Sequence, residues 1–517
     1  MTFDGIDRFA TNRRRFVAGS AAAAIATVMP ALLSRPVTAQ SASPVADLSD
    51  LVDEITIDLE IEPPSLDPAL GNDLNAWSVV HAIHDSLVNY DADGNAVPLL
   101  AESVEFTDPQ TVRIVLRSGR VFHDGSPVTS ESIKVALDHI RDPAVASQIA
   151  DNFATIETVT IVNDRTVDFG LSAPAPYLLA QFAPWLTPFP ASAVDTIGEA
   201  PIGAGPYKFV SWTPGESVVV EADPSYPADS PKGRAIAKKV TFRFVPEAAT
   251  RVADLLSGSA TIIRAVPPDQ TSAVTDGGAN VVTQPVTGIA FVRLVNNVAP
   301  FDDPRVRQAL NHAVDMPTII SSLLDGNGNP LSSLFPQGGL GYSPDLAPMT
   351  YDPELAKSLL TEAGVAERFA IDFEHTTDTR IDVVEAVAGY LGEVGLNVTL
   401  KPIEQATFNQ TWKESAPLRY VSWRPLNDPY TLLNLMINAN GFLSSFSSDT
   451  LQPLIDSAAI ETDPAKREAL YQQLAVALQQ DPPAIYLNSL VSLYGVVSDA
   501  PSWTSRPDDY TIPTFVG

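Results

Sequence analysis

The fold is decided by two neighbouring stretches of the chain, PLLAESVEF (residues 98–106) and VRIVLRSGRVFHDGSPVTSESIKVALDHIR (residues 112–141). Thr111 to Arg117 alternates β-branched and apolar residues with polar ones, a pattern that predicts a strand. His123-Asp124-Gly125 predicts a tight turn, because glycine tolerates a positive φ. Thr129 or Ser130 then offers a side-chain oxygen to cap a helix with an apolar stripe.

The second half of the chain contains well-marked helices. Asp303-Pro304, Asp352-Pro353 and Asp463-Pro464 each place a capping carboxylate before a proline, whose missing N–H costs nothing in the first turn of a helix. A strand, a helix and a strand are expected at residues 369–374, 381–391 and 396–403. Such a unit builds a parallel sheet, so the sequence predicts an α/β protein.

The first part of the chain predicts a strand at Glu54 to Ile61 and a helix from Trp77 to Tyr90. The helix is expected to lead into a hairpin turn at Asp91 to Asn95. This turn has the acidic composition of a calcium loop, but Ala96 occupies the sixth position, where a calcium loop needs glycine. The turn interpretation is therefore preferred.

These segments together resemble the family 5 extracellular solute-binding proteins of ABC importers, the peptide and nickel class that includes oligopeptide- and dipeptide-binding proteins. Members carry a P-x-LAES stretch, a strand, an FHDG turn and a capped helix, as residues 98–141 do. Four more segments resemble the family, in the family's order: GAGPY (203–207), NVAPFDDPRVRQALNHAVD (297–315), YDPELAKSLLTEAG (351–364) and LGEVGLNVTL (391–400). The resemblance covers most of the chain.

The resemblance implies a two-lobed periplasmic-binding-protein fold of type II, similar to cluster C, with an extra domain inserted in the first lobe. The expected domains are lobe one (residues 40–88, 200–295 and 489–517), the inserted domain (89–199) and lobe two (296–488). A ligand that contacts both lobes stabilises the closed form, so that closure signals occupancy to the importer.

The charge and cysteine content narrow the possible partners. With 32 basic and 62 acidic residues the formal charge is 32 − 62 = −30, which disfavours nucleic acid and anionic membrane surfaces as partners. The chain has 0 cysteines, which excludes disulfides, thiolate metal sites and a cysteine nucleophile. It also excludes a lipid anchor on a mature N-terminal cysteine. We expect a monomeric mature chain that is not inserted in a membrane.

The N-terminus has the pattern of a twin-arginine signal peptide. Arg13-Arg14-Arg15-Phe16 precedes an apolar run from Val17 to Leu33, and Val37-Thr38-Ala39 suits signal peptidase. We prefer cleavage near Ala39, which would remove residues 1–39, to retention of the apolar run as a membrane anchor, because the run is short for a span and contains Gly19 and Pro30. The mature protein is therefore expected in the periplasm or outside the cell.

The sequence lacks the local motifs of the common enzyme classes. It has no GxSxG elbow, no HExxH zinc helix and no GxxxxGK[ST] or GxGxxG phosphate-binding loop. His81 and His84 with Asp85 have a spacing that could bind a metal, but two histidines on one helix are more often structural. No catalytic residues, metal or cofactor are predicted.

The resemblance nominates ligand-binding residues in both lobes. Peptide-binding relatives carry a W-x-x-D-x-x-D-P-like segment whose first aspartate meets the α-amino group of the peptide. Here the segment is Trp423 to Pro429, one residue shorter, and the anchoring position falls on Leu426 or Pro425, neither of which pairs with an ammonium group. The nominated residues are Trp423, Arg424, Asn427 and Asp428 in lobe two and Asn72, Leu74, Asn75 and Trp77 in lobe one.

In this segment Arg424 is a candidate to receive a ligand carboxylate or phosphate, or else lies on the lobe surface. Trp423 either stacks on the ligand or fills the lobe core. The expected function is that of an importer's solute receptor, which captures a peptide-like or other small organic ligand and delivers it to the permease subunits. A secreted hydrolase of peptides or esters and an importer-independent sensor or chaperone subunit are the alternatives.

Overall fold

The computed structural model describes residue 49 and residues 51–71, 73–91, 94–376, 380–412, 415–423, 428–441 and 443–516. These residues belong to one compact unit, Ala42–Gly517. The expected signal peptide, residues 1–39, lies outside the described residues.

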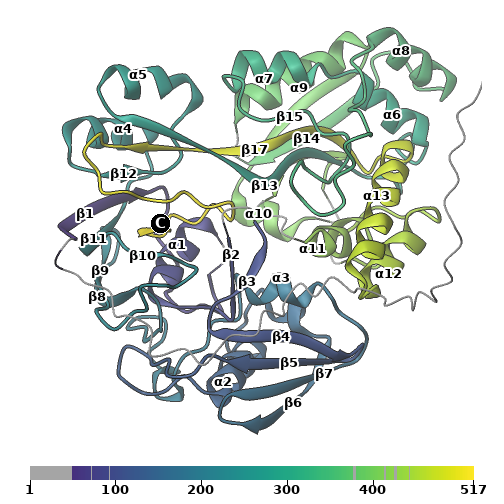
Figure 1. Cartoon of the computed structure of the whole chain (residues 1–517). Helices are drawn as coiled ribbons and strands as arrows, with labels where there is room; N and C mark the ends of the chain where they lie inside the picture. The colour runs from purple at the N-terminus through teal and green to yellow at the C-terminus, as the bar shows by residue number, and fades with distance from the viewer. Residues whose placement is uncertain are drawn as a thin grey trace, which may run out of the picture. The chain divides into compact units, whose positions relative to one another are not determined.

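A ten-stranded mixed sheet forms the centre of the unit (Figure 1). In spatial order its strands are β15 (Asn397–Ile403), β14 (Ala370–Thr376), β16 (Leu418–Trp423), β13 (Asn280–Leu294), β17 (Ala484–Val496), β12 (Ile262–Ile263), β1 (Val52–Leu59), β11 (Ala237–Phe244), β9 (Ser217–Ala222) and β8 (Tyr207–Thr213). The parallel pairing of β14 with β15 and the helix α9 (Ile381–Glu393) between them confirm the predicted strand–helix–strand unit.

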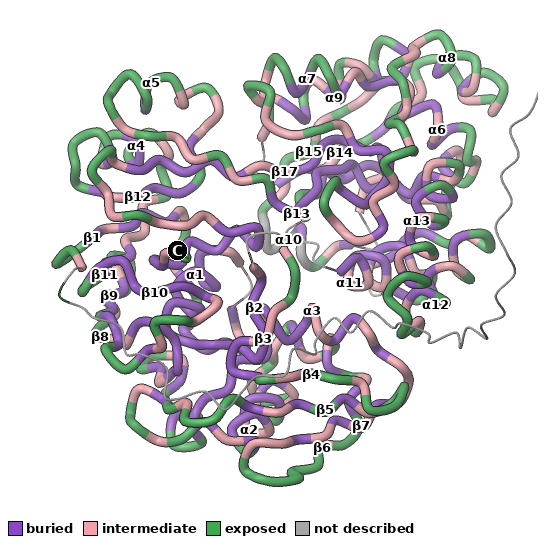
Figure 2. The backbone as a smooth tube through the Cα atoms, viewed as in Figure 1, coloured by how far each residue is buried: buried purple, intermediate pink, exposed green. Residues whose placement is uncertain are grey.

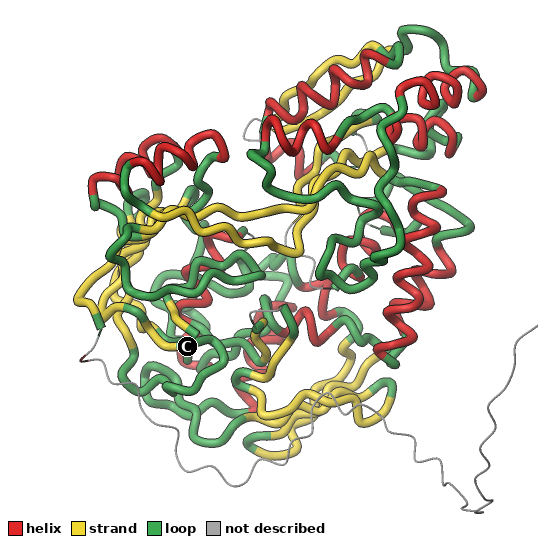
Figure 3. Tube along the Cα trace, turned by 45° about the horizontal axis from the view of Figure 1, so that its top comes forward, coloured by secondary structure: helices red, strands yellow, loops and turns green. Residues whose placement is uncertain are grey.

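Two long antiparallel strands, β13 and β17, run through both halves of this sheet (Figure 3). Near Asn280, β13 pairs with the end of β17 that also pairs with β12. Near Leu294, β13 pairs with β17 on one side and with β16 on the other. The ladder between β13 and β17 is irregular from Pro285 to Ile289. This irregular segment separates the part of the sheet built on β1 from the part built on β14.

The part built on β14, called lobe two below, has helices on both faces of its strands. Alternate residues of β13 and β16 point to two separate cores. One core is closed by α6 (Pro304–His312), α7 (Met316–Leu323), α8 (Pro353–Glu362) and α9. The other is closed by α10 (Gln405–Gln410), α11 (Tyr430–Leu432), a π-helix (Leu433–Ile437), α12 (Gln452–Ile460) and α13 (Pro464–Gln480).

The predicted Asp-Pro helix starts are confirmed. Backbone amides of α6, α8 and α13 donate to the carboxylates of Asp303, Asp352 and Asp463, and a proline is the first residue of each helix. Each carboxylate thus satisfies one or two of the amides that a helix leaves unpaired at its start.

The part built on β1, called lobe one below, packs α1 (Leu74–Ile83), α4 (Ala248–Ser257) and α5 (Thr271–Asp276) around its strands. Its smaller elements are the hairpin β2 (Val88–Tyr90) with β3 (Ala96–Pro98), the pair β10 (Arg234–Ala235) with β18 (Thr514–Phe515), and the 3-10 turn Pro268–Gln270. The helix predicted from Trp77 to Tyr90 is wrong at both ends, because α1 spans Leu74–Ile83 and Val88–Tyr90 is a strand.

A separate antiparallel sheet lies between β3 and β8 in the chain and has the order β4 (Ala101–Asp108), β5 (Thr111–Leu116), β7 (Thr166–Leu171), β6 (Ile156–Asn163). The helix α2 (Ser130–Arg141) packs its buried stripe on this sheet, and Thr129 and Ser132 form the capping box at its start. The short helices α3 (Leu178–Phe182), Ala150–Phe153 and Ala191–Ala193 complete the layer. Figure 2 shows the outward strand β6 largely exposed, whereas β5 and β7 alternate buried and open positions.

The segment GAGPY joins this layer to lobe one. A Cβ on Gly203 would lie 2.0 Å from the carbonyl oxygen of Ile83, at the end of α1, so only glycine fits. The carbonyl of Gly203 also accepts a hydrogen bond from the backbone N–H of His123 at 2.9 Å. The close approach explains why the sequence places glycine before the strand β8.

Candidate ligand-binding cavity

A cavity of about 1590 Å³ is lined by residues of both lobes and of the β4–β7 layer. Its walls include Trp77, Arg264, Val266 and Tyr510 from lobe one, and Ile149, Gln181 and Trp185 from the β4–β7 layer. Lobe two contributes Arg380, Phe408, Trp412, Tyr420, Trp423, Asp428 and Thr431, and β17 contributes residues 490–493. The cavity therefore lies where relative motion of the lobes would open or close it.

The lobe one side of the cavity is an aromatic wall. The Trp77 ring lies 6.5 Å from the Trp185 ring and 5.7 Å from the Tyr510 ring, measured between centroids. The Trp77 indole N–H donates to the carbonyl oxygen of Gly71 at 3.0 Å, which fixes the orientation of the ring. Asp73 caps α1 by accepting from two backbone amides, and so holds the helix that carries Trp77.

The lobe two side has a second aromatic group that rests on a buried arginine. Phe408 and Trp412 meet edge to face at 4.9 Å. The Arg419 guanidinium lies 4.7 Å from the Phe408 centroid and 5.2 Å from that of Trp412, and it pairs with Glu374 at 2.6 Å. Because the Arg419 side chain is 0% exposed, it holds the rings in place and does not reach into the cavity.

Several charged groups of the cavity wall already have partners within the protein. Arg264 pairs with Glu60 and Asp509 at 2.8 Å each. Arg380 pairs with Asp382 at 2.5 Å. The aromatic walls and these paired charges suit an organic ligand better than a simple ion, and the carboxylates of Asp151 and Asp269 also line the cavity.

Asp428 is likewise engaged. Its two carboxylate oxygens accept from the Arg467 guanidinium at 2.5 and 2.9 Å, and one of them also accepts from the backbone N–H of Tyr430. Both side chains are buried. Burial lowers the pKa of Arg467, but the Asp428 carboxylate beside it outweighs this effect and raises the pKa. Asp428 therefore shapes the wall of the cavity and has no free carboxylate for a ligand amine.

The β4–β7 layer and lobe two meet at the rim of the cavity. The rings of Tyr177 and Tyr430 stack with centroids 3.5 Å apart. Beside them, the Gln181 side-chain amide donates to the hydroxyl of Thr431 at 3.1 Å. The stack and this hydrogen bond are together called the rim contact below. Gln181 and Thr431, which form the hydrogen bond, are 250 residues apart in the chain.

The structure brings three of the predicted ligand-binding residues to the cavity: Trp77, Trp423 and Asp428. Leu74 and Asn75 are not among the described residues that line it. Asn75 is 4% exposed, and its side-chain oxygen accepts from the backbone N–H of Glu60 at 3.2 Å. Asn72, Arg424 and Asn427, like Pro425 and Leu426, lie outside the described residues.

Sequence reasoning missed Trp185, Trp412 and Gln181. The chain has 6 tryptophans, and four of them, at positions 77, 185, 412 and 423, line the cavity. A scarce, large aromatic residue in the loop after a short helix was the available signal, because such residues serve as contact surface for ligands. The glutamine carries no comparable signal.

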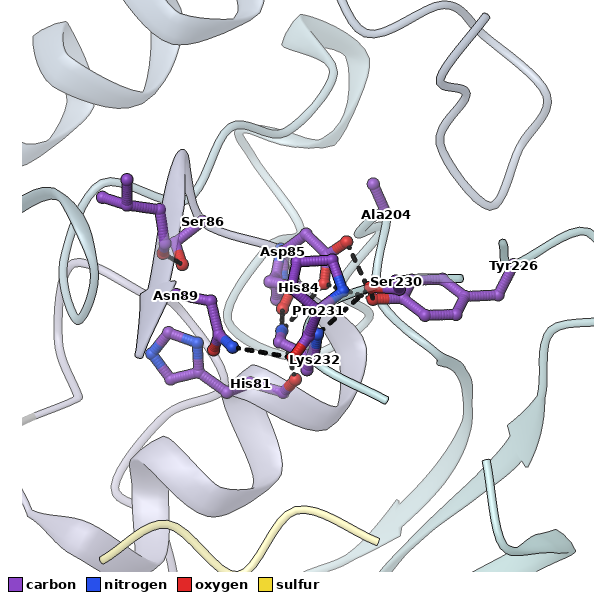
Figure 4. Close-up of polar contacts among 12 residues, drawn as sticks. His81, His84, Asp85, Ser86, Asn89, Ala204, Tyr226, Ser230, Pro231 and Lys232 are labelled. Carbon is purple, nitrogen blue, oxygen red and sulfur yellow. Dashed lines mark hydrogen bonds and ion pairs between the residues drawn. The ribbon is translucent and has the colours of Figure 1, made fainter. Parts of the chain in front are cut away.

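A second group of polar residues, at the end of α1, is structural (Figure 4). The Asp85 carboxylate is 0% exposed and pairs with Lys232 at 2.8 Å and with Arg120 at 2.7 Å. Lys232 also donates to the carbonyl oxygens of His81 and His84, at 2.9 and 2.7 Å. All three ammonium hydrogens thus have acceptors, and the cation compensates the carboxyl-terminal end of the helix dipole.

The histidines of this group are uncharged. Burial lowers the pKa of His84 to about 3 and that of His81 well below its usual value. A ring nitrogen of His81 is 3.0 Å from the carbonyl oxygen of Pro184, which ties α1 to the segment that carries Trp185. Within the described ranges no three side chains of metal-ligating type gather in one place.

The described chain is a two-lobed α/β protein with an aromatic cavity between its lobes, the architecture of a ligand-binding receptor. The family model of the bacterial extracellular solute-binding proteins, family 5 Middle, matches residues 95–442. The chain belongs to this family.

Two curated relatives illustrate its range. The probable D,D-dipeptide-binding periplasmic protein DdpA of Escherichia coli K12 is 25% identical over 476 residues, which cover 86% of this chain and 90% of the relative. The glutathione-binding protein GsiB of Pectobacterium atrosepticum is 28% identical over 449 residues, covering 82% of this chain and 86% of the relative.

Solved structures confirm the predicted fold class. The binding protein AgaA from A. tumefaciens R10, in complex with agropinic acid, matches with a TM-score of 0.76 and 26% identity over 89% of this chain and 96% of that one. DppA from Helicobacter pylori, in complex with the peptide STSA, matches with a TM-score of 0.78 and 21% identity over 90% and 97%.

The family establishes the general role. The protein is an extracytoplasmic solute-binding receptor of an ABC importer, with a small-molecule or peptide ligand and permease subunits as partners, and it is not an enzyme. The expected importer function is confirmed, and the hydrolase and sensor alternatives have no support. In the described ranges every helix is too short or too polar to cross a bilayer.

Proposed function

We propose that the protein binds a peptide-like or opine-like small organic compound whose α-amino group is blocked, absent or not used as the main anchor. The proposal rests mainly on the cavity between the lobes. Its volume of about 1590 Å³ exceeds the roughly 300–1,000 Å³ that is usual for small-ligand sites. Relatives named for D,D-dipeptides and glutathione, and the agropinic acid complex, support this range of chemistry.

The charge distribution supports the unusual anchor. The positions that align with the amine-binding aspartate of peptide-binding relatives are Pro425 and Leu426. The next carboxylate along the chain, Asp428, is occupied by Arg467. A ligand ammonium would therefore find no free carboxylate partner in this segment. A short modified peptide, an acylated or sugar-containing compound, or a metal chelate meets this restriction.

The proposed contacts to the ligand are stacking on Trp77 and Trp423 and, from residues outside the described ranges, polar contacts of Arg424, Asn427 and Asn72. The Arg424 guanidinium would receive a carboxylate or phosphate of the ligand through its planar fork. Aromatic faces bind ring and chain carbons of many compounds, so the tryptophans supply affinity and the polar groups supply selection.

The proposed domains are those expected from the sequence, with lobe one at 40–88, 200–295 and 489–517, the inserted domain at 89–199 and lobe two at 296–488. The self-contained β4–β7 sheet supports the insertion. The irregular ladder between Pro285 and Ile289 supports bending within β13, some residues before the expected limit at residue 295. Closure about this segment would bring the rim contact together.

For localisation, we propose export by the twin-arginine route with cleavage near Ala39, followed by release as a free monomer. The arginine-led apolar run and the small residues before the cleavage position support this route. The absence of cysteine from the sequence supports a protein without a lipid anchor. Mass measurement of the mature protein from its own source tests the cleavage, and loss of export after Arg14→Lys with Arg15→Lys tests the route.

The ligand proposal is tested in two steps. Native mass spectrometry of the protein purified from its own source should show a retained small molecule. D-alanyl-D-alanine, glutathione and agropinic acid are then titrated while tryptophan emission and the midpoint temperature of unfolding, Tm, are recorded. A bound compound stabilises the folded state in proportion to the logarithm of its concentration over its Kd. A flat emission and an unchanged Tm with all three, and no retained molecule, would contradict the proposal.

A further inference from the structure

Two polar atoms in the wall of the cavity lack partners among the residues that the structure describes. They are the side-chain oxygen Oε1 of Gln181 and the indole Nε1 of Trp185. Both atoms are buried, and both residues line the cavity. A buried donor or acceptor without a partner is costly, so a wall that keeps two of them needs an explanation.

Three other tryptophans of the chain have partners for their indole N–H groups. Trp77 donates to the carbonyl of Gly71 at 3.0 Å, Trp212 to the carboxylate of Glu62 at 2.9 Å, and Trp503 to the carbonyl of Ile512 at 2.8 Å. Each of these three indoles therefore has a partner at normal hydrogen-bond distance. Trp185, at the cavity, does not.

Gln181 uses only half of its amide. Its nitrogen Nε2 donates to the hydroxyl of Thr431 across the rim contact at 3.1 Å, whereas its oxygen is unpaired within the described residues. The residue is 3% exposed and belongs to α3. One side chain thus contacts lobe two with its donor and keeps an acceptor at the wall of the cavity.

The two atoms belong to one turn of the chain. The backbone N–H of Trp185 donates to the carbonyl oxygen of Gln181 at 3.2 Å, so the two residues are four apart on the same side of a helical turn. The contact between His81 and the carbonyl of Pro184 holds this turn against α1. Two neighbouring residues of the cavity lining thus carry an unpaired acceptor and an unpaired donor on one segment.

We infer that Gln181 and Trp185 form a hydrogen-bonding subsite for a ligand group that carries a donor and an acceptor side by side, such as an amide. The ligand donor binds Oε1 of Gln181, and the ligand acceptor binds Nε1 of Trp185. Because Nε2 of Gln181 holds Thr431 of lobe two, a ligand in this subsite also supports the closed rim. The inference rests on the proposed function, since it assigns part of the same cavity.

The first test needs no ligand. Trp185, Trp212 and Trp503 are each replaced in the full mature protein by 3-benzothienylalanine, which keeps the ring shape and removes the N–H. All three residues are partly buried, which makes the set matched. The replacement at 185 should leave Tm unchanged or raise it, whereas those at 212 and 503 should lower it. A fall in Tm at 185 equal to that at the other two positions would overturn the inference.

Gln181 is tested by a double-mutant cycle with Thr431. Thr431→Val removes the acceptor of Nε2, so that the amide of Gln181 no longer holds the rim. If Gln181 also keeps an unpaired buried oxygen, Gln181→Met in the Thr431→Val background should raise Tm of the empty protein. A fall in Tm in that background shows that the oxygen has a partner in the empty protein, and it overturns the inference.

Binding is then measured with D-alanyl-D-alanine and glutathione, both of which contain amide groups. For each probe that binds the unaltered protein, the Trp185 replacement and Gln181→Met should each raise Kd about tenfold, as expected for one lost hydrogen bond. The replacement at Trp212 should leave Kd unchanged. Equal Kd values for all variants would count against the subsite. If neither probe binds the unaltered protein, the peptide-like ligand proposal is weakened, and the Tm comparisons still decide the inference.

Discussion

The phenol ring of Tyr177 stacks on that of Tyr430 with centroids 3.5 Å apart and planes inclined by 6°. The hydroxyl of Tyr177 lies 2.6 Å from that of Thr155, which belongs to the same layer. Burial raises the pKa of Tyr430, so its hydroxyl stays neutral at physiological pH. Tyr430 directly precedes Thr431, which lines the cavity.

The first prediction concerns this stack. Tyr430→Ala should favour the open form of the empty protein, because a stacked aromatic pair contributes about 0.5–1.5 kcal/mol beyond its buried area. Spin labels on Glu131→Cys and Ser358→Cys report the distance between the β4–β7 layer and lobe two, and the chain has 0 cysteines that would interfere. The mean distance should lengthen in Tyr430→Ala and stay unchanged in Tyr430→Phe. An identical distance distribution in all three proteins would show that the stack does not hold the rim.

The second prediction concerns Gly203. Gly203→Ala should destabilise the protein by about 1–3 kcal/mol or prevent folding, because its methyl group would overlap the carbonyl of Ile83. Urea unfolding measures the loss. Gly389→Ala in α9 is the matched control, since nothing lies within 4 Å of its added Cβ and alanine favours a helix. Equal stability of the two variants would mean that the Gly203 loop moves freely away from α1.

A third prediction concerns the buried pair of Asp428 and Arg467. Asp428→Leu alone should cost about 3–5 kcal/mol, because it leaves a buried guanidinium without its counter-charge. Replacing both residues, Asp428→Leu with Arg467→Met, should recover much of this loss. Arg113→Ala, which breaks an exposed pair with Asp168, serves as the control and should have little effect. Chemical unfolding of the four proteins provides the comparison, and a double variant no better than the single one would contradict the argument.

The fourth prediction concerns pH. Burial lowers the pKa of His81, His84 and His123, so these residues stay neutral in the folded protein when they would be protonated in the unfolded chain. The contribution of His84 is fully present above about pH 6.5 and is lost as the pH falls towards about 3, the pKa of its ring. His84 thus costs about 1.4 kcal/mol per pH unit in this range.

His139 acts in the opposite direction, because its bond to Asp67 raises its pKa, so it stabilises below about pH 6.5 and loses this effect as the pH rises. The free energy of unfolding should therefore fall between pH 6.5 and 5. Its slope should correspond to the uptake of more than one proton on unfolding. His84→Gln should reduce that slope by about one proton in urea unfolding at each pH. An unchanged slope would show that His84 is already protonated in the folded protein.

Local chemistry predicted the elements that depend on neighbours in sequence. The carboxylates of Asp303, Asp352 and Asp463 cap helices through amides two or three residues away, so their role could be recognised directly. The end of α1 could not, because its last carbonyls are bound by Lys232, about 150 residues further along the chain. After Ile83 the sequence continues with residues that a helix tolerates, so it does not mark the end of α1.

The cavity shows the same division. Trp77 and Trp423 were nominated from the family pattern and line the cavity, while Leu74 and Asn75 were nominated with them and lie outside its described lining. Neighbouring residues on a helix point in different directions, and only the packing of α1 decides which one faces the ligand. The hydrogen bond of Gln181 to Thr431 and the unpaired polar atoms of Gln181 and Trp185 arise only after folding.

The chain crosses between the lobes in β13 and β17, two neighbours in one hydrogen-bonded ladder. A pair of strands joined edge to edge bends easily across its plane and resists shearing within it, so we expect the lobes to swing about one axis. On this proposed movement, every compound that fits the cavity should drive the same closure and expose the same outer face. A permease that recognises this face reads whether the receptor is loaded, and the chemical identity of the cargo is judged only by the receptor.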